Sequence, residues 1–435
     1  MGIDAVINGG LSFAAVLVLM ILNIPIGIAM LFVGFIGFAL ISGFDPAIFV
    51  LGTAPFDAVS KYTLSVLPLF VLMGNLANSS NLSRNLYDAA YAIVGHYKGG
   101  LAMSTVGACA GFGMICGSSI ATAATMSQMA GPEMRRHGYS DALISGSIAS
   151  GGTLGIIIPP SVILVIYGLL TEQSIGKLFM AGFLPGIMGI LFYTLAVLFV
   201  VSRNPSLGPA GEKSEWQERL LALKDVWTTL ALFIFVIGGI YIGLFSATEA
   251  AGMGAAGALL IAISSGNLKF YEYFDVLRDA SILAAKLFAL LFGATMFSNF
   301  LNRAGLPDAL MSIINSLELS GIAVIFIILL IYILLGCVFE SMSMILLTVP
   351  IFVPLVQTLG FDLIWFGILV VVVTEISLIT PPIGLNVFVL KGVVKDVSVG
   401  TIFYGVTPFW VADIIRLAII TLFPAIALFL PSMMF

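Results

Sequence analysis

The chain has 435 residues, of which 60% are hydrophobic and 9% are charged, and its formal net charge is -5. This composition lies far outside that of a soluble domain, so a soluble enzyme or binding protein is excluded and the expected solvent is lipid. The sequence has no basic stripe of the kind that binds nucleic acid, so no nucleic-acid partner is expected.

Apolar stretches long enough to cross ~30 Å of hydrocarbon recur from Leu11 to the C-terminus. Examples are Phe183 to Val201, Trp227 to Phe245 and Gly321 to Phe339. Since the length leaves room for roughly ten such spans, we predict one all-α polytopic membrane protein. The first span is expected to stay in the protein, because no Lys or Arg precedes Lys61 as in a cleaved signal.

The first polar interruption in chain order is Gly117 to Thr125, a run of small and hydroxyl residues within apolar sequence. A re-entrant hairpin that turns here would present carbonyl and hydroxyl oxygens to an aqueous cavity. Such oxygens ligate hard cations, here sodium. Ordinary helix packing through small residues is the alternative, and it requires no ion.

The next interruption is a glycine-rich stretch, Gly151 to Gly155, which leads to Pro159, Pro160 and Ser161. Two consecutive prolines remove two backbone donors and block the preceding helical turn, so a helix broken into two half-helices is predicted. The exposed ends of half-helices can hold an anionic group on the N-terminal side and a cation on the carbonyl side.

The most polar connection, Ser202 to Asp225, contains four basic residues in a short loop. Basic residues favour the cytoplasmic face, so we place this loop there. It divides the chain into a first repeat at residues 1–201, a connecting loop at 202–225 and a second repeat at 226–435.

The two halves correspond at an offset of 222 residues, mainly at positions that fix backbone geometry. Ser119 falls on Ser341, Pro132 on Pro354, Gly138 on Gly360, and Pro159-Pro160 on Pro381-Pro382. The second half therefore repeats the predicted hairpin at Phe339 to Ser343 and the predicted broken helix at Thr380 to Asn386.

Basic residues also indicate how the halves are oriented. The stretch Arg84 to Arg136 contains four Lys or Arg residues, whereas the corresponding stretch Leu306 to Thr358 contains none. By the positive-inside rule these stretches lie on opposite faces of the membrane. We therefore predict inverted repeats, an architecture of many secondary transporters, with the binding site near the midplane.

Charged residues within the apolar segments are costly and need a reason to be there. Glu340 and Glu375 are the best functional candidates, and capping or pairing beside a helix break is their alternative role. Asp413 and Arg416 are three residues apart and can pair on one helix face.

Two further basic residues, Lys286 and Arg303, are expected near the membrane ends, where their side chains can reach water. None of the basic residues is an obvious carboxylate clamp, so the residues leave the substrate undecided.

Neither cysteine nor histidine indicates a metal or catalytic centre. Cys109, Cys116 and Cys337 lie in apolar surroundings without metal-binding spacing, which favours a packing role. The only histidines are His96 and His137, both in loop-like sequence. An intramembrane enzyme needs a nucleophile with a base or a metal cluster, so this chain is not expected to be an enzyme.

Three segments together resemble the large membrane subunit of the tripartite ATP-independent periplasmic (TRAP) transporters. They are Gly117 to Met126 (GSSIATAATM), Gly152 to Ser161 (GTLGIIIPPS) and Thr380 to Phe388 (TPPIGLNVF), and the resemblance covers essentially the whole chain. It implies a multi-pass protein of the bacterial inner membrane that works as an elevator, with a scaffold and a mobile transport domain of two hairpins and two broken helices.

The resemblance further implies sodium-coupled uptake of an organic-acid anion, of the C4-dicarboxylate or sialic acid class. It implies two partners, a separate small membrane subunit and a periplasmic substrate-binding protein. A sodium carrier of similar hairpin architecture that needs no binding protein is one alternative. A passive channel, which would not accumulate solute, is another.

The resemblance also assigns site residues. It places sodium ligands, mostly through carbonyl oxygens, at Ser119, Gly151, Gly152, Thr153, Ser341, Ser343, Thr380, Pro381 and Gly384. It places substrate contacts at Ser118, Thr122, Glu340 and Asn386, with Ser118 also beside the first sodium group. For Asn386, satisfying backbone groups freed by Pro382 is an equal alternative.

Overall fold

The computed structural model describes residues 2–78, 82–266 and 269–434, and within these ranges every regular element is a helix. The predicted all-α class is therefore confirmed. Six helices in the described ranges are long and apolar enough to cross a membrane, or seven if the bent pair Trp216–Thr228 and Leu230–Tyr241 forms one span. This is fewer than the roughly ten expected from length, because several apolar helices are shorter than a full crossing.

The first half begins and ends with helices long enough to cross a membrane, α1 and α10, and has shorter or more polar helices between them. They are α1 (Gly2–Ile21), α2 (Ile26–Ser42), α3 (Phe44–Ser60), η1 (Tyr62–Ser65), α4 (Val66–Asn78), α5 (Leu82–Val94), α6 (Gly100–Cys116), α7 (Ser119–Arg136), α8 (Asp141–Leu154), α9 (Val162–Thr171), α10 (Ile175–Arg203) and η2 (Pro205–Leu207).

The second half follows a similar order from its third helix onward. Its helices are α11 (Trp216–Tyr241), α12 (Ala247–Ser265), α13 (Phe270–Arg303), α14 (Leu306–Ser316), α15 (Gly321–Leu335), α16 (Ser341–Thr358), α17 (Leu363–Ser377), α18 (Leu385–Val393), α19 (Val399–Leu422) and α20 (Ala425–Ser432).

The connection between the halves is shorter than predicted. Helix α10 continues to Arg203, and α11 begins at Trp216, so residues 216–225 are helical. The reason is local: Glu215 and Glu218 form a capping box that begins α11. The charges of this segment predict a loop, yet acidic residues in the first turn of a helix favour a helix start.

Hydroxyl and carboxylate caps explain why helices begin directly after the polar interruptions. Ser118, Ser140 and Ser161 each accept a hydrogen bond from the backbone N–H three residues on, at the starts of α7, α8 and α9. Asp362 does the same for α17, accepting from the N–H groups of Ile364 and Trp365. The same residues that made these segments look polar therefore define the ends of the helices.

Helices at the 222-residue offset have nearly the same bounds. Helix α7 covers 119–136 and α16 covers 341–358, and the glycines after them, Gly138 and Gly360, both have positive φ. Both Pro-Pro peptide bonds are cis. The packing is reciprocal too: α9 packs against α16 as α18 packs against α7, and α10 against α17 as α19 against α8. The two halves thus interlock through equivalent helices.

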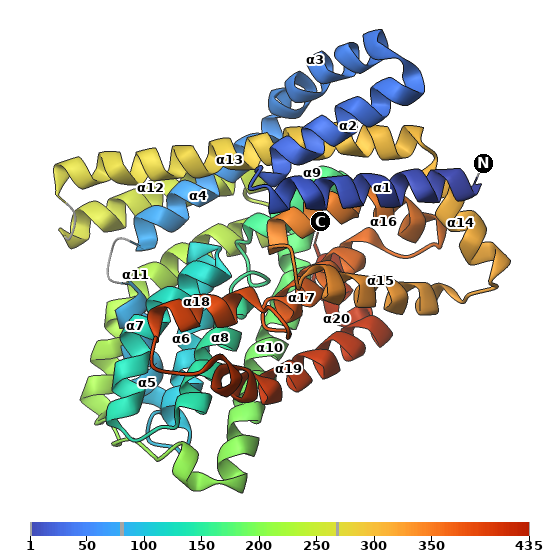
Figure 1. Cartoon of the computed structure of the whole chain (residues 1–435). Helices are drawn as coiled ribbons and strands as arrows, with labels where there is room; N and C mark the ends of the chain where they lie inside the picture. Colours follow the sequence, from blue (N-terminus) through green and yellow to red (C-terminus); the bar gives the residue numbers. More distant parts are fainter. Residues whose placement is uncertain (1, 79–81, 267–268, 435) are drawn as a thin grey trace.

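Helices from the two halves also form a separate layer. Helix α13 packs along α2 and α4, and α12 packs against α4. In Figure 1 these helices lie together at the top, above the group that contains α5 to α8 and α17 to α19. We call α1 to α4 with α12 and α13 the upper layer, and this layer borders the site described next.

Candidate transport site at the hairpin tips

A cavity of about 270 Å³ lies where the tips of both hairpins meet the first helix break and the upper layer. The first hairpin, α6 and α7, contributes Gly117, Ser118 and Ser119, and the second, α15 and α16, contributes Glu340 and Ser341. The remaining lining residues used below are Ile156 and Pro160 of the first break, and Phe70, Met73, Leu283, Lys286, Leu287 and Leu290 of α4 and α13. Segments more than 200 positions apart in sequence therefore form one site.

The first tip turns tightly at Gly117, whose φ is +65°, a conformation that glycine adopts readily. Ser118 then caps α7, and its carbonyl accepts a hydrogen bond from the Thr122 hydroxyl at 2.8 Å. Ser118 and Ser119 line the cavity, whereas Thr122 is buried behind them. The sequence prediction of a hairpin with its hydroxyl run at the tip agrees with this geometry.

The second tip has a carboxylate in the equivalent position. Glu340 is the N-cap residue of α16, and the Ser343 hydroxyl reaches its Oε1 at 3.5 Å. Ser341 lines the cavity, while Ser343 is buried behind it. Glu340 and Ser118 thus occupy corresponding places on the two tips and face one cavity.

The glycines assigned to sodium lie inside α8. A Cβ atom at Gly152 would lie 3.1 Å from the Ser119 carbonyl oxygen, so these two residues are in direct contact. The Thr153 hydroxyl donates to the Ser150 carbonyl at 2.8 Å, and the Thr153 carbonyl accepts from the N–H groups of Gly155 and Ile156. The structure therefore brings Gly152 to the first hairpin and leaves Thr153 engaged within the break.

The residues assigned to sodium at the second break lie apart from the cavity. The Thr380 hydroxyl donates to the Ile376 carbonyl at 2.6 Å and accepts from the Trp410 indole at 2.9 Å. The Pro381 carbonyl faces the Cys337 thiol at 3.7 Å, and Gly384, with φ +58°, begins α18. None of Thr380, Pro381 or Gly384 is among the residues that line the 270 Å³ cavity.

Asn386 joins the two breaks. Its side chain is fully buried and donates from Nδ2 to the Ala149 carbonyl of α8 at 3.1 Å, while its backbone N–H donates to Leu378. It does not line the cavity. This hydrogen bond connects the second break to the first half. It satisfies a backbone carbonyl, which resembles the alternative role considered for Asn386.

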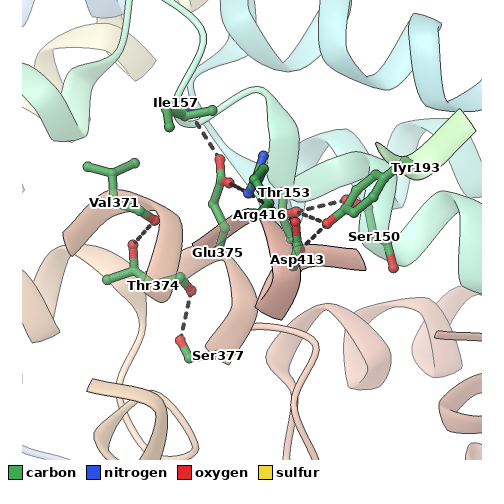
Figure 2. Close-up of polar contacts among 10 residues, drawn as sticks. All are labelled: Ser150, Thr153, Ile157, Tyr193, Val371, Thr374, Glu375, Ser377, Asp413 and Arg416. Carbon is green, nitrogen blue, oxygen red and sulfur yellow. Dashed lines mark hydrogen bonds and ion pairs between the residues drawn. The ribbon is translucent and has the colours of Figure 1, made fainter. Parts of the chain in front are cut away.

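A buried charged network fixes the first break, as Figure 2 shows. Glu375 of α17 accepts a hydrogen bond from the Ile157 backbone N–H at 3.2 Å and one from Arg416 of α19 at 2.7 Å. Arg416 also lies 3.1 Å from the Asp413 carboxylate, which the Tyr193 hydroxyl contacts. The predicted pairing of Asp413 with Arg416 is present in the structure.

The network is costly to disrupt because Glu375, Asp413 and Arg416 are fully buried. Removing one member of a buried ion pair leaves an uncompensated charge, at a cost of about 3–5 kcal/mol. The guanidinium of Arg416 also occupies the space that a side chain at Gly189 would need. Glu375 thus pairs beside a helix break, the alternative role considered for it, and it holds that break against the second half.

The structure places Lys286 near the middle of α13, which spans Phe270–Arg303, and there it lines the cavity. Arg303 is the last residue of α13 and donates to the Ser42 hydroxyl at 3.1 Å. That both residues lie near the membrane ends stays a prediction, because a helix of 34 residues is about 51 Å long and extends beyond a hydrocarbon core of ~30 Å. The place of Lys286 in the cavity wall was not predicted, because the sequence alone does not tell which face of α13 meets the cavity.

Sequence reasoning also missed a second cavity of about 520 Å³ farther along α13. Its polar lining on that helix is Thr295, Ser298, Asn299 and Asn302. This i, i+3, i+4, i+7 spacing places them on one helix face, and that spacing was the signal available. Facing them are α3, α9 and α16.

Ion pairs outside the apolar segments connect elements at two places. Arg135, at the end of α7, lies 2.7 Å from Asp396, in the loop after α18, and this guanidinium holds the pKa of the Asp396 carboxyl below its ordinary value. Lys61, before η1, lies 3.1 Å from Glu172, directly after α9. We call the two hairpins, α6 with α7 and α15 with α16, together with the helices beside the two breaks, α8, α9, α17 and α18, the hairpin group. The first pair joins two segments of this group, and the second joins the group to the upper layer.

The family model of the tripartite ATP-independent periplasmic transporter, DctM component, matches residues 13–426. The chain belongs to this family. It is the large permease subunit of a TRAP transporter and a multi-pass protein of the inner membrane, so the resemblance seen in the three motifs is confirmed. Relatives of this family are named as transporter permeases, in agreement with the expectation that the chain is not an enzyme.

The chain is 35% identical to the C4-dicarboxylate TRAP transporter large permease protein DctM of Pseudomonas aeruginosa, over 87% of this chain and 88% of that one. It is 29% identical to the sialic acid TRAP transporter large permease protein SiaM of Vibrio cholerae, covering 95% and 96%. The ectoine/5-hydroxyectoine permease UehC of Ruegeria pomeroyi is 28% identical, covering 97% and 98%.

Among solved structures, the Alcanivorax borkumensis YdaH transporter has a similar fold, with a TM-score of 0.64 over 88% of this chain and 89% of that one. Its sequence identity is 13%, so the likeness concerns the fold alone.

Proposed function

We propose that this TRAP permease takes up an organic-acid anion together with sodium ions, after a periplasmic binding protein delivers the anion. A separate small membrane subunit completes the transporter. The relatives named above for C4-dicarboxylates, sialic acid and ectoine all handle molecules that carry a carboxylate. A carboxylate of the C4-dicarboxylate or sialic acid class is therefore the substrate we propose.

The observation that carries the proposal is the single cavity formed by both hairpin tips and the first break. Its walls carry the Ser118, Ser119 and Ser341 hydroxyls, and the Ser119 carbonyl lies against Gly152. These are hard oxygen donors, which suit sodium better than a transition metal. The N-cap residues of α7 and α16, Ser118 and Glu340, both line this space, so the positive ends of two helix dipoles border it, which favours an anion beside the cation.

The test is uptake in proteoliposomes that contain the permease with its small subunit and binding protein. A sodium gradient is expected to drive accumulation of the anion, and replacing sodium with choline is expected to abolish it. Undiminished accumulation in choline would contradict sodium coupling. Accumulation without the binding protein would instead favour the binding-protein-independent carrier, and equilibration without accumulation would favour a channel.

We also propose that the hairpin group moves as one unit against the upper layer, as in an elevator. Carrying the site intact avoids exposing freed backbone groups to lipid. Two ion pairs give matched crosslinks. A bifunctional thiol crosslinker between Lys61→Cys and Glu172→Cys, with a spacer that replaces the two long side chains, joins unit to upper layer and is expected to arrest uptake. One between Arg135→Cys and Asp396→Cys lies within the unit and is expected to be tolerated. Full activity after the first crosslink would rule out an elevator.

A further inference from the structure

We propose that Lys286 is a substrate ligand, contributed by the upper layer and not by the hairpin group, so that it binds the substrate carboxylate from one face of the membrane only. This inference rests on the proposed uptake of an organic-acid anion. It names a basic residue that the three family motifs do not contain.

The first step is the position of Lys286 along its helix. Helix α13 runs from Phe270 to Arg303, and at 1.5 Å per residue Lys286 lies about 24 Å along the axis from either end. Helix α13 is therefore about 51 Å long, more than the ~30 Å of a hydrocarbon core, so the position of Lys286 is defined by the cavity that it lines and not by its distance from the helix ends. A charged group in the wall of such a cavity needs water or a partner.

The second step is its surroundings. On α13, Leu283, Leu287 and Leu290 line the same cavity, so the ammonium group has no polar neighbour on its own helix face. Among the residues that the structure describes, no hydrogen bond or ion pair satisfies Lys286. The other polar side chains that line the cavity are Asn75 of α4 and those of the two hairpin tips, Ser118, Ser119, Glu340 and Ser341.

The third step is charge. Glu340 also lines the cavity, and no cationic side chain in the described residues lies within 4.0 Å of its carboxylate. With Glu340 alone, the cavity would repel an anion. With Lys286 present, the negative charges of Glu340 and one substrate carboxylate are balanced by the positive charges of Lys286 and one sodium ion. A charge-assisted hydrogen bond from the ammonium to the carboxylate is the stronger kind of polar contact.

The fourth step is sidedness. Helix α13 packs along α2 and α4 of the upper layer, while Ser118, Ser119 and Glu340 belong to the hairpins. When the hairpin group moves against the upper layer, the hairpin residues travel with the substrate and Lys286 stays behind. Lys286 therefore adds affinity in the orientation seen here and is absent from the site in the opposite one.

The experiment compares wild type, Lys286→Met and Lys286→Arg in right-side-out and inside-out vesicles that contain the complete transporter. Radiolabelled succinate and N-acetylneuraminate are the probes. From one face, Lys286→Met is expected to raise KM about 10-fold or more, the effect of losing a hydrogen bond to a charged group. Lys286→Arg keeps the positive charge and is expected to restore most of the lost affinity. From the other face, KM is expected to stay within about 2-fold, as is the half-saturating sodium concentration.

Lys269→Met is the matched control, because Lys269 precedes α13 outside the cavity and its loss is expected to leave KM unchanged. Equal KM values for wild type and Lys286→Met on both faces would overturn the inference, and so would an equal rise on both faces. If the wild type takes up neither acid in the presence of sodium, the proposed function itself is contradicted. If Lys286→Met protein does not fold, Lys286→Gln replaces it.

Discussion

The two helix breaks have similar sequences and opposite surroundings. In the first break every residue from 155 to 161 is buried, whereas in the second Pro381, Pro382 and Ile383 are exposed. The first break is closed by the Ser161 hydroxyl, which donates to the Ile156 carbonyl, and by the Glu375 carboxylate from the other half. At the position equivalent to Ser161 the second break has Ile383, and the bonds that close this break within the described ranges are local backbone bonds.

This difference teaches that a repeated motif does not fix a repeated environment. A backbone N–H left without a helical partner where the helix breaks has to be satisfied, and the two halves do so differently. In the first half a charged side chain from α17 does it, so the break is bound to its neighbours. In the second half, local bonds suffice: the Ile379 N–H donates to Ile376 at 3.2 Å. The second break can therefore change its surroundings without breaking a buried ion pair.

The largest expected effect is on the network that closes the first break. Arg416→Met leaves Glu375 and Asp413 buried without a cation, and we expect it to destabilise the protein by about 3–5 kcal/mol. Thermal unfolding in detergent measures this as a lower midpoint. The double variant Arg416→Met with Glu375→Gln is expected to lose less than the sum of the single losses. Additive losses would show that the two residues act independently.

A smaller effect compares the breaks directly. A Cβ atom at Gly155 would collide with the backbone of Gly113 and Met114, so Gly155→Ala forces α6 and the first break apart. We expect it to cost about 1–3 kcal/mol, the usual range for overpacking. Ile383→Ala removes an exposed side chain at the second break and is expected to stay within ±0.5 kcal/mol. Equal decreases in the thermal unfolding midpoint of Gly155→Ala and Ile383→Ala would contradict the difference between the two breaks.

The smallest effect concerns the surface pair beyond the second half-helix. Arg135 lowers the pKa of Asp396, so the folded protein gains stability from this carboxylate above the pKa it has in the unfolded chain. That gain is lost as pH falls through the lowered pKa of the folded state. Asp396→Asn is expected to lower the unfolding midpoint slightly near neutral pH, and the difference should vanish in acid. A difference that grew on acidification would contradict the assignment.

Much of the fold could be predicted from backbone-determining residues. Paired prolines, glycines and hydroxyl caps act locally, so the hairpin at Gly117 and the break at Pro159 were found from sequence alone. The partners across space were not. Whether Glu375 met a substrate or an arginine depended on the packing of α17 against α19, which no local signal encodes.

The candidate site was predicted in part for the same reason. Ser118, Ser119, Glu340 and Ser341 reach one cavity because each begins or caps a hairpin arm. Thr380 and Asn386 were grouped with them because they lie on either side of a proline pair, yet their side chains bond within the protein. Lys286 was predicted near a membrane end and not in the cavity wall, because an apolar helix carries no marker of which face meets the cavity.

Helix α13 borders both cavities, and the change from one to the other takes a single residue step. Leu290 lines the 270 Å³ cavity and Leu291 lines the 520 Å³ cavity. On this helix, two adjacent leucine side chains therefore line different cavities. A hydrated sodium ion crossing such a strip would have to shed its water against hydrocarbon, which is strongly unfavourable. In the sodium-coupled transport that we propose, apolar side chains at this boundary oppose such a crossing, which would let sodium run down its gradient without driving uptake.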